Sequence, residues 1–277
     1  MPLTCHDGPV SEASDRRPDG VERVALLVTC VGEMVEPDVP VAAVRVLRAA
    51  GCSVEVPDGQ TCCGQPAWNS GFTADAAKVA RTSLDALERA VADGADAVVV
   101  PAGSCATMVR IYWPQLFALD GDDAASQRAR ALGERVWELT ELLDAMPPER
   151  LHFGSVEPCA AVYHRSCHML RELHVAEQPE ALLGRVDGCD VAPWAAADQC
   201  CGFGGTFSVK LPEASVAMAD EKLDVLPEGT EVIVGADASC LMQLRTRAGS
   251  RGLQVRTEHV AQVLERALPG TDGGATS

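Results

Sequence analysis

Eight cysteines recur in two sets of four with nearly the same spacing. The first frame consists of Cys30, Cys62, Cys63 and Cys105, and the second frame of Cys167, Cys200, Cys201 and Cys240. The offset between the frames is 137 residues for the first cysteine, 138 for both members of the vicinal pair and 135 for the last. Independently placed cysteines would not keep this register, so the chain is interpreted as an internal duplication.

Four thiols in each half indicate a metal centre. Thiolates are soft ligands that suit zinc, copper(I) or iron–sulfur clusters rather than magnesium or calcium. Adjacent cysteines are an awkward pair for one tetrahedral zinc ion, because structural zinc sites space their thiols by two or more residues. Gly64 and Gly202, which follow the vicinal pairs, leave room for close backbone approach. We therefore expect the eight cysteines to bind iron–sulfur clusters, one of the 4Fe-4S type per half, with zinc in one half left open.

Composition narrows the class of protein. The 277 residues include 40 acidic and 23 basic side chains, a formal net charge of -17, which would repel nucleic acid and anionic lipid headgroups. No apolar run approaches the roughly 18 residues of a membrane span, and the polar first twenty residues lack the apolar segment of a signal peptide. We expect a cytoplasmic protein. Its twelve cysteines are then not expected to form structural disulfides, because cytosolic thiols are kept reduced.

The frames must be positioned by alternating strands and helices. Short aliphatic runs predict strands buried on both faces, and amphipathic stretches between them predict helices. The expected strands are 23–29, 52–56, 97–100, 160–164, 189–192 and 231–235. The expected helices are 41–50, 73–92, 108–119, 136–146, 212–226, 240–248 and 257–268.

This order predicts an α/β fold of two pseudo-symmetric duplicated lobes, each a small parallel sheet with flanking helices. Pro147 and Pro148 mark the boundary between them. The expected division is a flexible polar tail at 1–20, a first cysteine-rich domain at 21–150, a second at 151–268 and a flexible tail at 269–277. Every frame cysteine follows the carboxyl end of an expected strand, where open parallel sheets bind ligands. Cys105 and Cys240 are expected near helix N-terminal amides, which stabilise negative charge.

Several segments resemble the cysteine-rich CCG domain family. They are DQCCGFGGTFSVK at 198–210, CCGQPAWNSG at 62–71, PAGSC at 101–105, YHRSCH at 163–168 and SCLM at 239–242. The resemblance covers about 21–268, and within the family the chain is most similar to the lactate utilization A branch. The wider family includes the B-type subunit of heterodisulfide reductase and the iron–sulfur subunit of glycolate oxidase.

The resemblance implies the iron–sulfur subunit of a cytoplasmic complex that oxidises L-lactate to pyruvate together with lactate utilization proteins B and C. The family frame ends in Cys-x-x-Cys, which gives five thiols and a non-cubane cluster. Ala102 and Asp237 replace the first cysteine of that pair here, so four thiols per half remain, enough for an ordinary cluster or for zinc. Asp237 is a candidate oxygen ligand or a helix cap.

Two other functions stay open: a thiol–disulfide oxidoreductase subunit of the heterodisulfide reductase kind, and a zinc-stabilised scaffold without catalysis. The sequence identifies no catalytic residue. Arg165, His164 and His168 are the nearest candidates for a lactate site, and either histidine could also contact the metal centre.

The remaining cysteines and two aromatic residues are interpreted conservatively. Cys5, Cys52, Cys159 and Cys189 lie outside the frames, and the last three are expected in the core. Trp68 and Phe207 follow the vicinal pairs and could shield a cluster from water or pack in the core.

Overall fold

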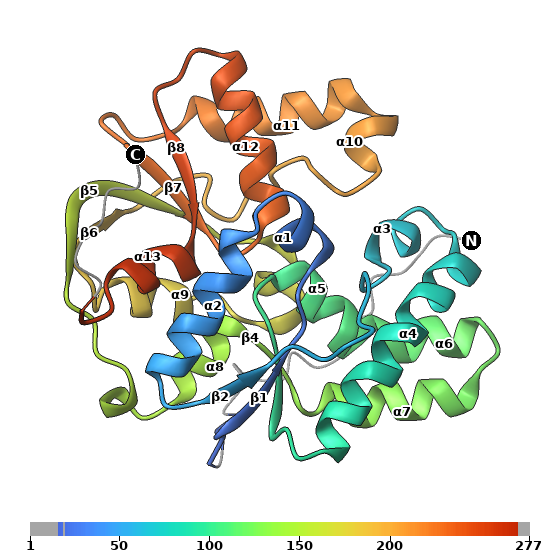
Figure 1. Ribbon diagram of the computed structural model, residues 1–277. Coiled ribbons are helices and arrows are strands. Elements are labelled where there is room, and N and C mark those ends of the chain that lie inside the picture. Colours follow the sequence, from blue (N-terminus) through green and yellow to red (C-terminus); the bar gives the residue numbers. More distant parts are fainter. Residues whose placement is uncertain (1–15, 19, 271–277) are drawn as a thin grey trace.

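Two four-stranded parallel sheets form the centres of two lobes in the computed structural model, which describes residues 16–18 and 20–270 (Figure 1). The first sheet has the order β2-β1-β3-β4 and the second the order β6-β5-β7-β8. The strands are β1 (Arg23–Leu26), β2 (Ser53–Glu55), β3 (Ala97–Val100), β4 (Val136–Glu138), β5 (Ser155–His164), β6 (Asp187–Ala192), β7 (Val232–Gly235) and β8 (Arg256–His259). The predicted α/β fold with two duplicated parallel-sheet lobes is confirmed.

The duplication extends to the register of the strands. Val24 lies opposite Ala97 in the first sheet, and their repeat mates Ala161 and Val232 lie opposite each other in the second. All four residues of β3 and of β7 are buried. This is the pattern of parallel strands covered by helices on both faces.

Helices occupy most of the segments between strands. They are α1 (Cys30–Met34), α2 (Asp38–Ala49), α3 (Gln65–Trp68), α4 (Thr73–Ala92), α5 (Gly103–Thr107), α6 (Trp113–Leu119), α7 (Asp123–Gly133), α8 (Leu139–Ala145), α9 (Gln178–Leu183), α10 (Phe207–Lys210), α11 (Pro212–Asp224), α12 (Ala238–Ser250) and α13 (Val260–Arg266), with π-helical turns at Met108–Tyr112 and Met169–Leu173 and a 3-10 turn at Pro148–Arg150. None of these helices combines the length and the apolar character needed to cross a bilayer.

The last predicted helix of each lobe is wrong at its start. The helices expected at 136–146 and 257–268 are each a short strand that runs directly into a shorter helix, β4 into α8 and β8 into α13. No turn residues separate strand from helix, because a capping box makes the junction. The Glu138 carboxylate accepts hydrogen bonds from the Thr140 and Glu141 amides, and His259 Nδ1 accepts one from the Ala261 amide.

Helix α7 was also not predicted. It begins at Asp123, the last residue of the acidic segment 120–123, and the Asp122 side chain accepts a hydrogen bond of 2.9 Å from the Ala125 amide. An acidic residue at this position caps the first turn of a helix. The acidic segment therefore starts and caps a helix.

The lobes share one interior. Helices α2 and α13, from opposite halves of the chain, lie side by side (Figure 1), and one continuous apolar core contains residues of both lobes. Arg150, beside the predicted boundary, donates hydrogen bonds to the carbonyls of Val21 and Ala50. The division at residue 150 stays a prediction.

Most of the predicted tails, with Cys5, lies outside the described residues. Arg16 is described, and it donates to the Val136 carbonyl at 3.0 Å and lies over the Trp137 ring. The predicted first tail is therefore attached to β4 at this point.

Candidate metal centre

The loops that leave the strands carry both cysteine frames to one edge of each sheet. Cys30 is the first residue of α1, after β1, and Cys105 lies in the first turn of α5, after β3. In the second lobe Cys167 follows β5 and Cys240 lies in the first turn of α12, after β7. The prediction that Cys105 and Cys240 lie near helix N-termini is confirmed.

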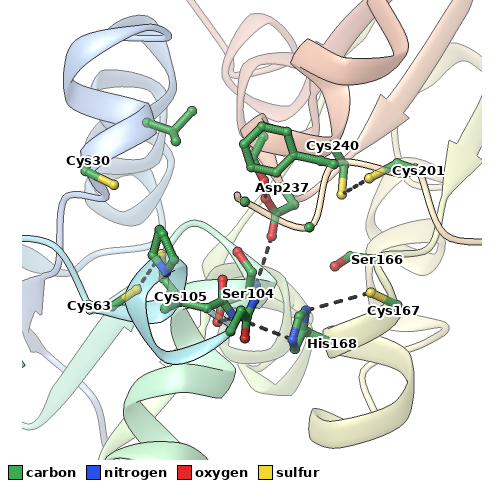
Figure 2. Close-up of a pocket in the computed structure, with 18 of the residues that line it drawn as sticks. Cys30, Cys63, Ser104, Cys105, Ser166, Cys167, His168, Cys201, Asp237 and Cys240 are labelled. Carbon is green, nitrogen blue, oxygen red and sulfur yellow. Dashed lines mark hydrogen bonds between the residues drawn. The ribbon is translucent and has the colours of Figure 1, made fainter. Parts of the chain in front are cut away.

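All eight frame cysteines line a single cavity between the lobes. Figure 2 shows Cys30, Cys63 and Cys105 on one side of it and Cys167, Cys201 and Cys240 on the other. The other lining residues are Val31, Gln65, Pro66, Asn69, Ser104, Ser166, His168, Phe203, Gly204, Gly205, Asp237 and Ser239 together with Cys62 and Cys200. The sequence placed the frames at matching edges of two lobes but did not predict that the edges face each other.

Close sulfur pairs occur within each frame. The Sγ–Sγ distance is 3.6 Å for Cys30 and Cys62 and 3.3 Å for Cys63 and Cys105. In the second frame Cys201 Sγ lies 2.8 Å from Cys240 Sγ. Each half therefore gathers thiols that a soft metal could bind together.

One thiol in each frame is acidified by its neighbours. The pKa of Cys62 falls to about 3 because the thiols of Cys30 and then Cys63 donate hydrogen bonds to its sulfur. The pKa of Cys200 falls to about 2 through the equivalent donors Cys167 and Cys201. The donors shift the other way, and the pKa of Cys30 and of Cys167 is raised. The lowered pKa favours the thiolate form of Cys62 and Cys200, and the thiolate is the form that binds metal.

Backbone groups hold the vicinal pairs in place. The amides of Gly64 and Gly202 each lie 3.4 Å from the sulfur two residues earlier, and both glycines have positive φ, +86° and +84°. A Cβ at these positions would approach the Ala76 carbonyl oxygen to 2.9 Å and the Ser215 carbonyl oxygen to 2.4 Å. The predicted need for close backbone approach is thus explained by the helices α4 and α11.

Trp113 contacts the backbone of the first vicinal pair, and the sequence did not predict this contact. Its indole nitrogen, fully buried in α6, donates a hydrogen bond of 2.8 Å to the Cys63 carbonyl. An aromatic residue a few turns after a frame cysteine carries no pattern that distinguishes this contact from ordinary core packing.

Asp237 connects the two lobes. Its Oδ2 accepts a hydrogen bond of 2.9 Å from the Ser104 amide at the start of α5, and its Oδ1 accepts one of 2.6 Å from the Ser239 hydroxyl (Figure 2). The carboxylate is buried, and both oxygens face hydrogen-bond donors. It acts as a cap on a helix of the opposite lobe.

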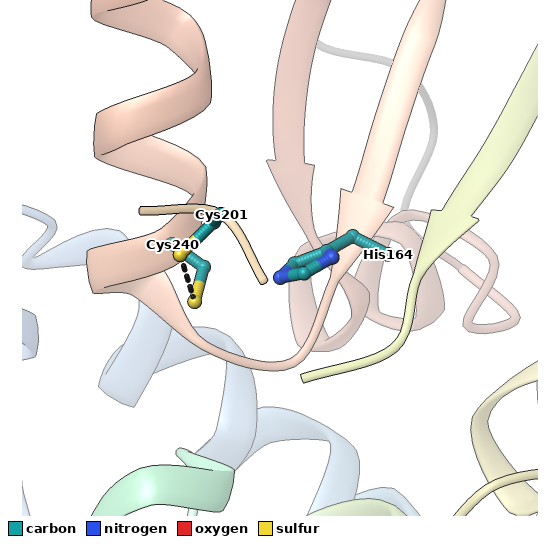
Figure 3. A group of neighbouring side chains, drawn as sticks. All are labelled: His164, Cys201 and Cys240. Atoms are coloured by element: carbon teal, nitrogen blue, oxygen red, sulfur yellow. Dashed lines mark hydrogen bonds between the residues drawn. The ribbon is translucent and has the colours of Figure 1, made fainter. Parts of the chain in front are cut away.

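The two histidines near Cys167 have different positions. His168 lines the cavity, with Nδ1 3.7 Å from Cys167 Sγ and Nε2 3.4 Å from the Gln65 amide nitrogen. His164 lies outside the lining, fully buried behind the sulfurs of Cys201 and Cys240. One of its ring nitrogens and these two sulfurs lie within 4.8 Å of one another (Figure 3).

Burial controls the charge of His164. Its pKa is lowered to about 3, first by desolvation and then by the nearby Lys222 ammonium, against smaller raising effects of Asp237, Cys200 and the Ala197 carbonyl. Neither ring nitrogen has a hydrogen-bond partner of normal geometry. His164 is therefore a neutral imidazole.

The other candidates lie away from the cavity. Arg165 pairs with Glu180 at 2.7 Å and with Asp198 at 3.4 Å. Trp68 packs on Tyr112, Phe207 belongs to α10, and Phe203 is the aromatic side chain that lines the cavity. Cys52, Cys159 and Cys189 are buried, as expected of core residues.

The donor set fits an iron–sulfur cluster in each half. Each frame supplies four cysteine sulfurs at the cavity surface, one of them with a lowered pKa, and backbone amides are directed at Cys62 and Cys200. Amide hydrogen bonds to ligand sulfur stabilise the negative charge of such clusters. The closely spaced His164, Cys201 and Cys240 would also suit one zinc ion.

A family model described as "Cysteine-rich domain" (CCG) matches the chain twice, at residues 24–110 and 161–245. The two matches cover more than half of the chain, and one lies within each lobe. The chain belongs to the CCG cysteine-rich domain family. In this CCG protein each match contains the four cysteines of one frame.

Several curated relatives of this CCG protein are named lactate utilization protein A. A protein named lactate utilization protein A from an Exiguobacterium species is 44% identical over 247 residues, which cover 88% of this chain and 98% of that protein. Proteins of the same name from Bacillus velezensis and Bacillus subtilis are 42% and 39% identical over 244 residues, covering 87% of this chain and 98% of each relative. The resemblance to the lactate utilization A branch is confirmed.

Proposed function

We propose that the chain is the iron–sulfur subunit of a cytoplasmic complex that oxidises L-lactate to pyruvate. The observation that carries the proposal is the pair of four-thiol frames on one cavity, in a chain that spans nearly the whole length of relatives named lactate utilization protein A. The protein is then an oxidoreductase subunit that carries electrons.

The frame cysteines are proposed as the cluster ligands, four in each half. Oxidation of L-lactate to pyruvate releases two electrons and two protons, and an iron–sulfur cluster, when bound, accepts electrons singly. Two frames on one cavity would hold two clusters close together, one for each electron. This is a physical reason for a duplicated centre.

Lactate itself is proposed to bind elsewhere in the complex. A carboxylate substrate calls for a cationic clamp, and none of the described residues that line the cavity is an arginine or a lysine. Arg165, the nearest arginine considered, is already paired with two carboxylates. The substrate site and the further electron carriers are assigned to partners, lactate utilization proteins B and C.

The test is a metal and sulfide count on protein purified without oxygen. Wild type is expected to contain iron and acid-labile sulfide in both halves and to absorb visible light. Cys62→Ser and Cys200→Ser are each expected to lose the content of one half, whereas Cys189→Ser, a buried cysteine outside the frames, keeps both. A strain lacking the gene is expected to lose growth on L-lactate, with rescue by wild type but not by Cys62→Ser/Cys200→Ser.

Protein without iron and sulfide would overturn the proposal. Zinc in their place would favour the scaffold function, for which the close spacing of His164, Cys201 and Cys240 is the relevant observation. Two frames facing each other across one cavity also favour the thiol–disulfide function. Turnover of a small disulfide with a reduced viologen, without any growth defect on lactate, would support that alternative.

A further inference from the structure

The duplication identifies which residues correspond between the two centres. The 137-residue offset of the first frame cysteine places Leu27 opposite His164. The sheets agree, since the preceding residues Leu26 and Tyr163 pair with Val99 and Val234, which are themselves repeat mates. Leu27 and His164 are both buried. An aliphatic side chain in the first lobe is therefore replaced by an imidazole in the second.

A second pair follows from the glycine turns. Gly64 packs on the Ala76 carbonyl and Gly202 on the Ser215 carbonyl, so Ala76 and Ser215 are equivalent positions of α4 and α11. Seven residues further along each helix stand Ser83 and Lys222, both fully buried.

Ser83 and Lys222 make the same kind of contact. The Ser83 hydroxyl bonds the amide and carbonyl of Thr61, and the Lys222 ammonium donates to the carbonyls of Ala196 and Ala197. Each ties its helix to the loop before a vicinal cysteine pair. The second lobe does so with a residue that carries a positive charge.

The Lys222 charge has no carboxylate partner. Its hydrogen bonds go to carbonyls, its Nζ lies 3.9 Å from the centre of the Trp194 ring, and no ion pair of the described residues includes it. Desolvation lowers its pKa to about 8, against opposing effects of the Cys201 and Cys240 sulfurs, the Asp198 carboxylate and the Cys200 sulfur. A buried ammonium without a counter-charge is costly. The second frame, with its thiolates bound to a cluster, would supply such a counter-charge.

His164 adds a polar group on the same side. Its ring lies behind Cys201 and Cys240, outside the cavity lining, so it can donate a hydrogen bond to a sulfur without occupying the cavity (Figure 3). Donors to ligand sulfurs and nearby positive charge both favour the more negative, reduced state of a thiolate-bound centre.

We propose that Lys222 and His164 give the second-lobe centre a higher reduction potential than the first-lobe centre, where Ser83 and Leu27 stand. The proposal rests on the proposed function, in that both frames hold redox clusters. Oxidation of a 2-hydroxy acid to the 2-oxo acid releases two electrons and two protons, and two bound clusters would take one electron each. When only one electron is present, the second-lobe centre would hold it. Lys222 and His164 are positioning residues in this scheme.

The test is a reductive titration followed by electron paramagnetic resonance, with iron and sulfide counted on every sample. Cys200→Ser and Cys62→Ser each leave one centre and assign the two signals. In wild type the second-lobe signal is expected to appear at the higher potential. Equal potentials, or the reverse order, would overturn the proposal without any further variant.

Three substitutions then test whether Lys222 and His164 cause the higher potential of the second-lobe centre. Lys222→Met is expected to lower the reduced-to-oxidised ratio of the second-lobe centre at least tenfold at a fixed potential, about 59 mV for a one-electron couple. His164→Leu, which installs the first-lobe residue, is expected to shift it in the same direction. Lys222→Arg, which keeps the charge, is expected to restore most of the wild-type value.

Lys210→Met is the matched control, because Lys210 is an exposed lysine of the second lobe and its loss changes net charge equally. It is expected to leave both potentials unchanged. A second-lobe potential that Lys222→Met leaves unchanged, at full iron content, would contradict the assignment to Lys222. Absence of clusters would instead contradict the proposed function, so the two failures are distinguishable.

Discussion

Single residues decide how the two halves differ. Ala102 and Asp237 stand at the same position of the two frames, but the first is a small apolar residue and the second a buried carboxylate. Asp237 uses both oxygens to accept hydrogen bonds, one of them from Ser104 in the other lobe. The residue therefore belongs to the interface between lobes as much as to its own frame.

Asp237→Asn is expected to keep full metal content, since an amide oxygen can accept from the Ser104 amide while the amide nitrogen donates to the Ser239 hydroxyl. Asp237→Ala leaves the buried donors unpaired and is expected to lower the free energy of unfolding by about 1–3 kcal/mol. Chemical denaturation and an iron count measure the two effects. If Asp237→Asn unfolds like wild type but loses iron, the carboxylate is a ligand after all.

At the scale of elements, the glycine turn after each vicinal pair is the device that both lobes share. Positive φ alone makes an L side chain unfavourable there by roughly 1–2 kcal/mol. The carbonyls of α4 and α11 add a steric limit, tighter at Gly202 than at Gly64. The helix therefore fixes where the vicinal cysteines stand relative to the cavity.

Alanine substitutions separate the cost of positive φ from the cost of the steric clash with a helix carbonyl. Gly229 has φ +80° and no atom within 4 Å of a built Cβ, so Gly229→Ala is expected to cost about 1 kcal/mol and to keep all metal. Gly64→Ala is expected to cost more, and Gly202→Ala most, above about 2 kcal/mol, with loss of metal from its own lobe. Denaturation midpoints and iron counts test this order; equal costs for Gly202→Ala and Gly229→Ala would refute the packing explanation.

The junction of β4 and α8 contains a buried titratable group. Burial raises the pKa of Glu138 from 4.5 to about 8, even though Thr140 and Glu141 donate hydrogen bonds to its carboxylate. The folded protein thus binds this proton more tightly than the unfolded chain. The stability contributed by the protonated form is complete below about pH 4.5 and is lost as pH rises to about 8.

Glu138→Gln removes this titration. Relative to wild type, the variant is expected to gain a few kcal/mol of unfolding free energy between about pH 5 and 9, since each unit of pKa shift corresponds to about 1.4 kcal/mol. Denaturation series at several pH values measure the difference. Glu134→Gln, at an exposed position, should show no such trend, and a pH-independent difference for Glu138→Gln would mean that Glu138 ionises normally.

For the whole molecule, the two lobes are united by a common core and a common cavity. Apolar residues of both lobes form one continuous cluster, and α13 of the second lobe packs on α2 of the first. Surface ion pairs such as Arg45 with Glu265 also join the lobes, but exposed pairs contribute little. Because this apolar core is shared, we expect the two lobes to unfold together.

A single cooperative unfolding transition is therefore expected for the metal-free protein. Leu264→Ala, a fully buried position in α13, should lower the unfolding free energy by about 2–5 kcal/mol and shift the transition without splitting it. Circular dichroism and tryptophan fluorescence should give the same midpoint. Val209→Ala, 80% exposed, serves as control, and two separate transitions would show independently folding lobes.

The sequence by itself determined the chemistry and the fold class. Thiol identity, the repeated spacing of the frames and the periodicity of the strands are local properties, and so β3 and α4 were predicted to the residue. The short strands β4 and β8 escaped prediction because each continues into a capped helix with no intervening turn, which leaves no break in the pattern.

Only the tertiary structure decided that both frames share one cavity, that Asp237 caps a helix of the other lobe and that Lys222 lies beside the second frame. These relations join residues far apart in the chain. They depend on which helix faces pack together across the lobes, such as α2 on α13. Periodicity shows that a face is apolar, but not which other face covers it.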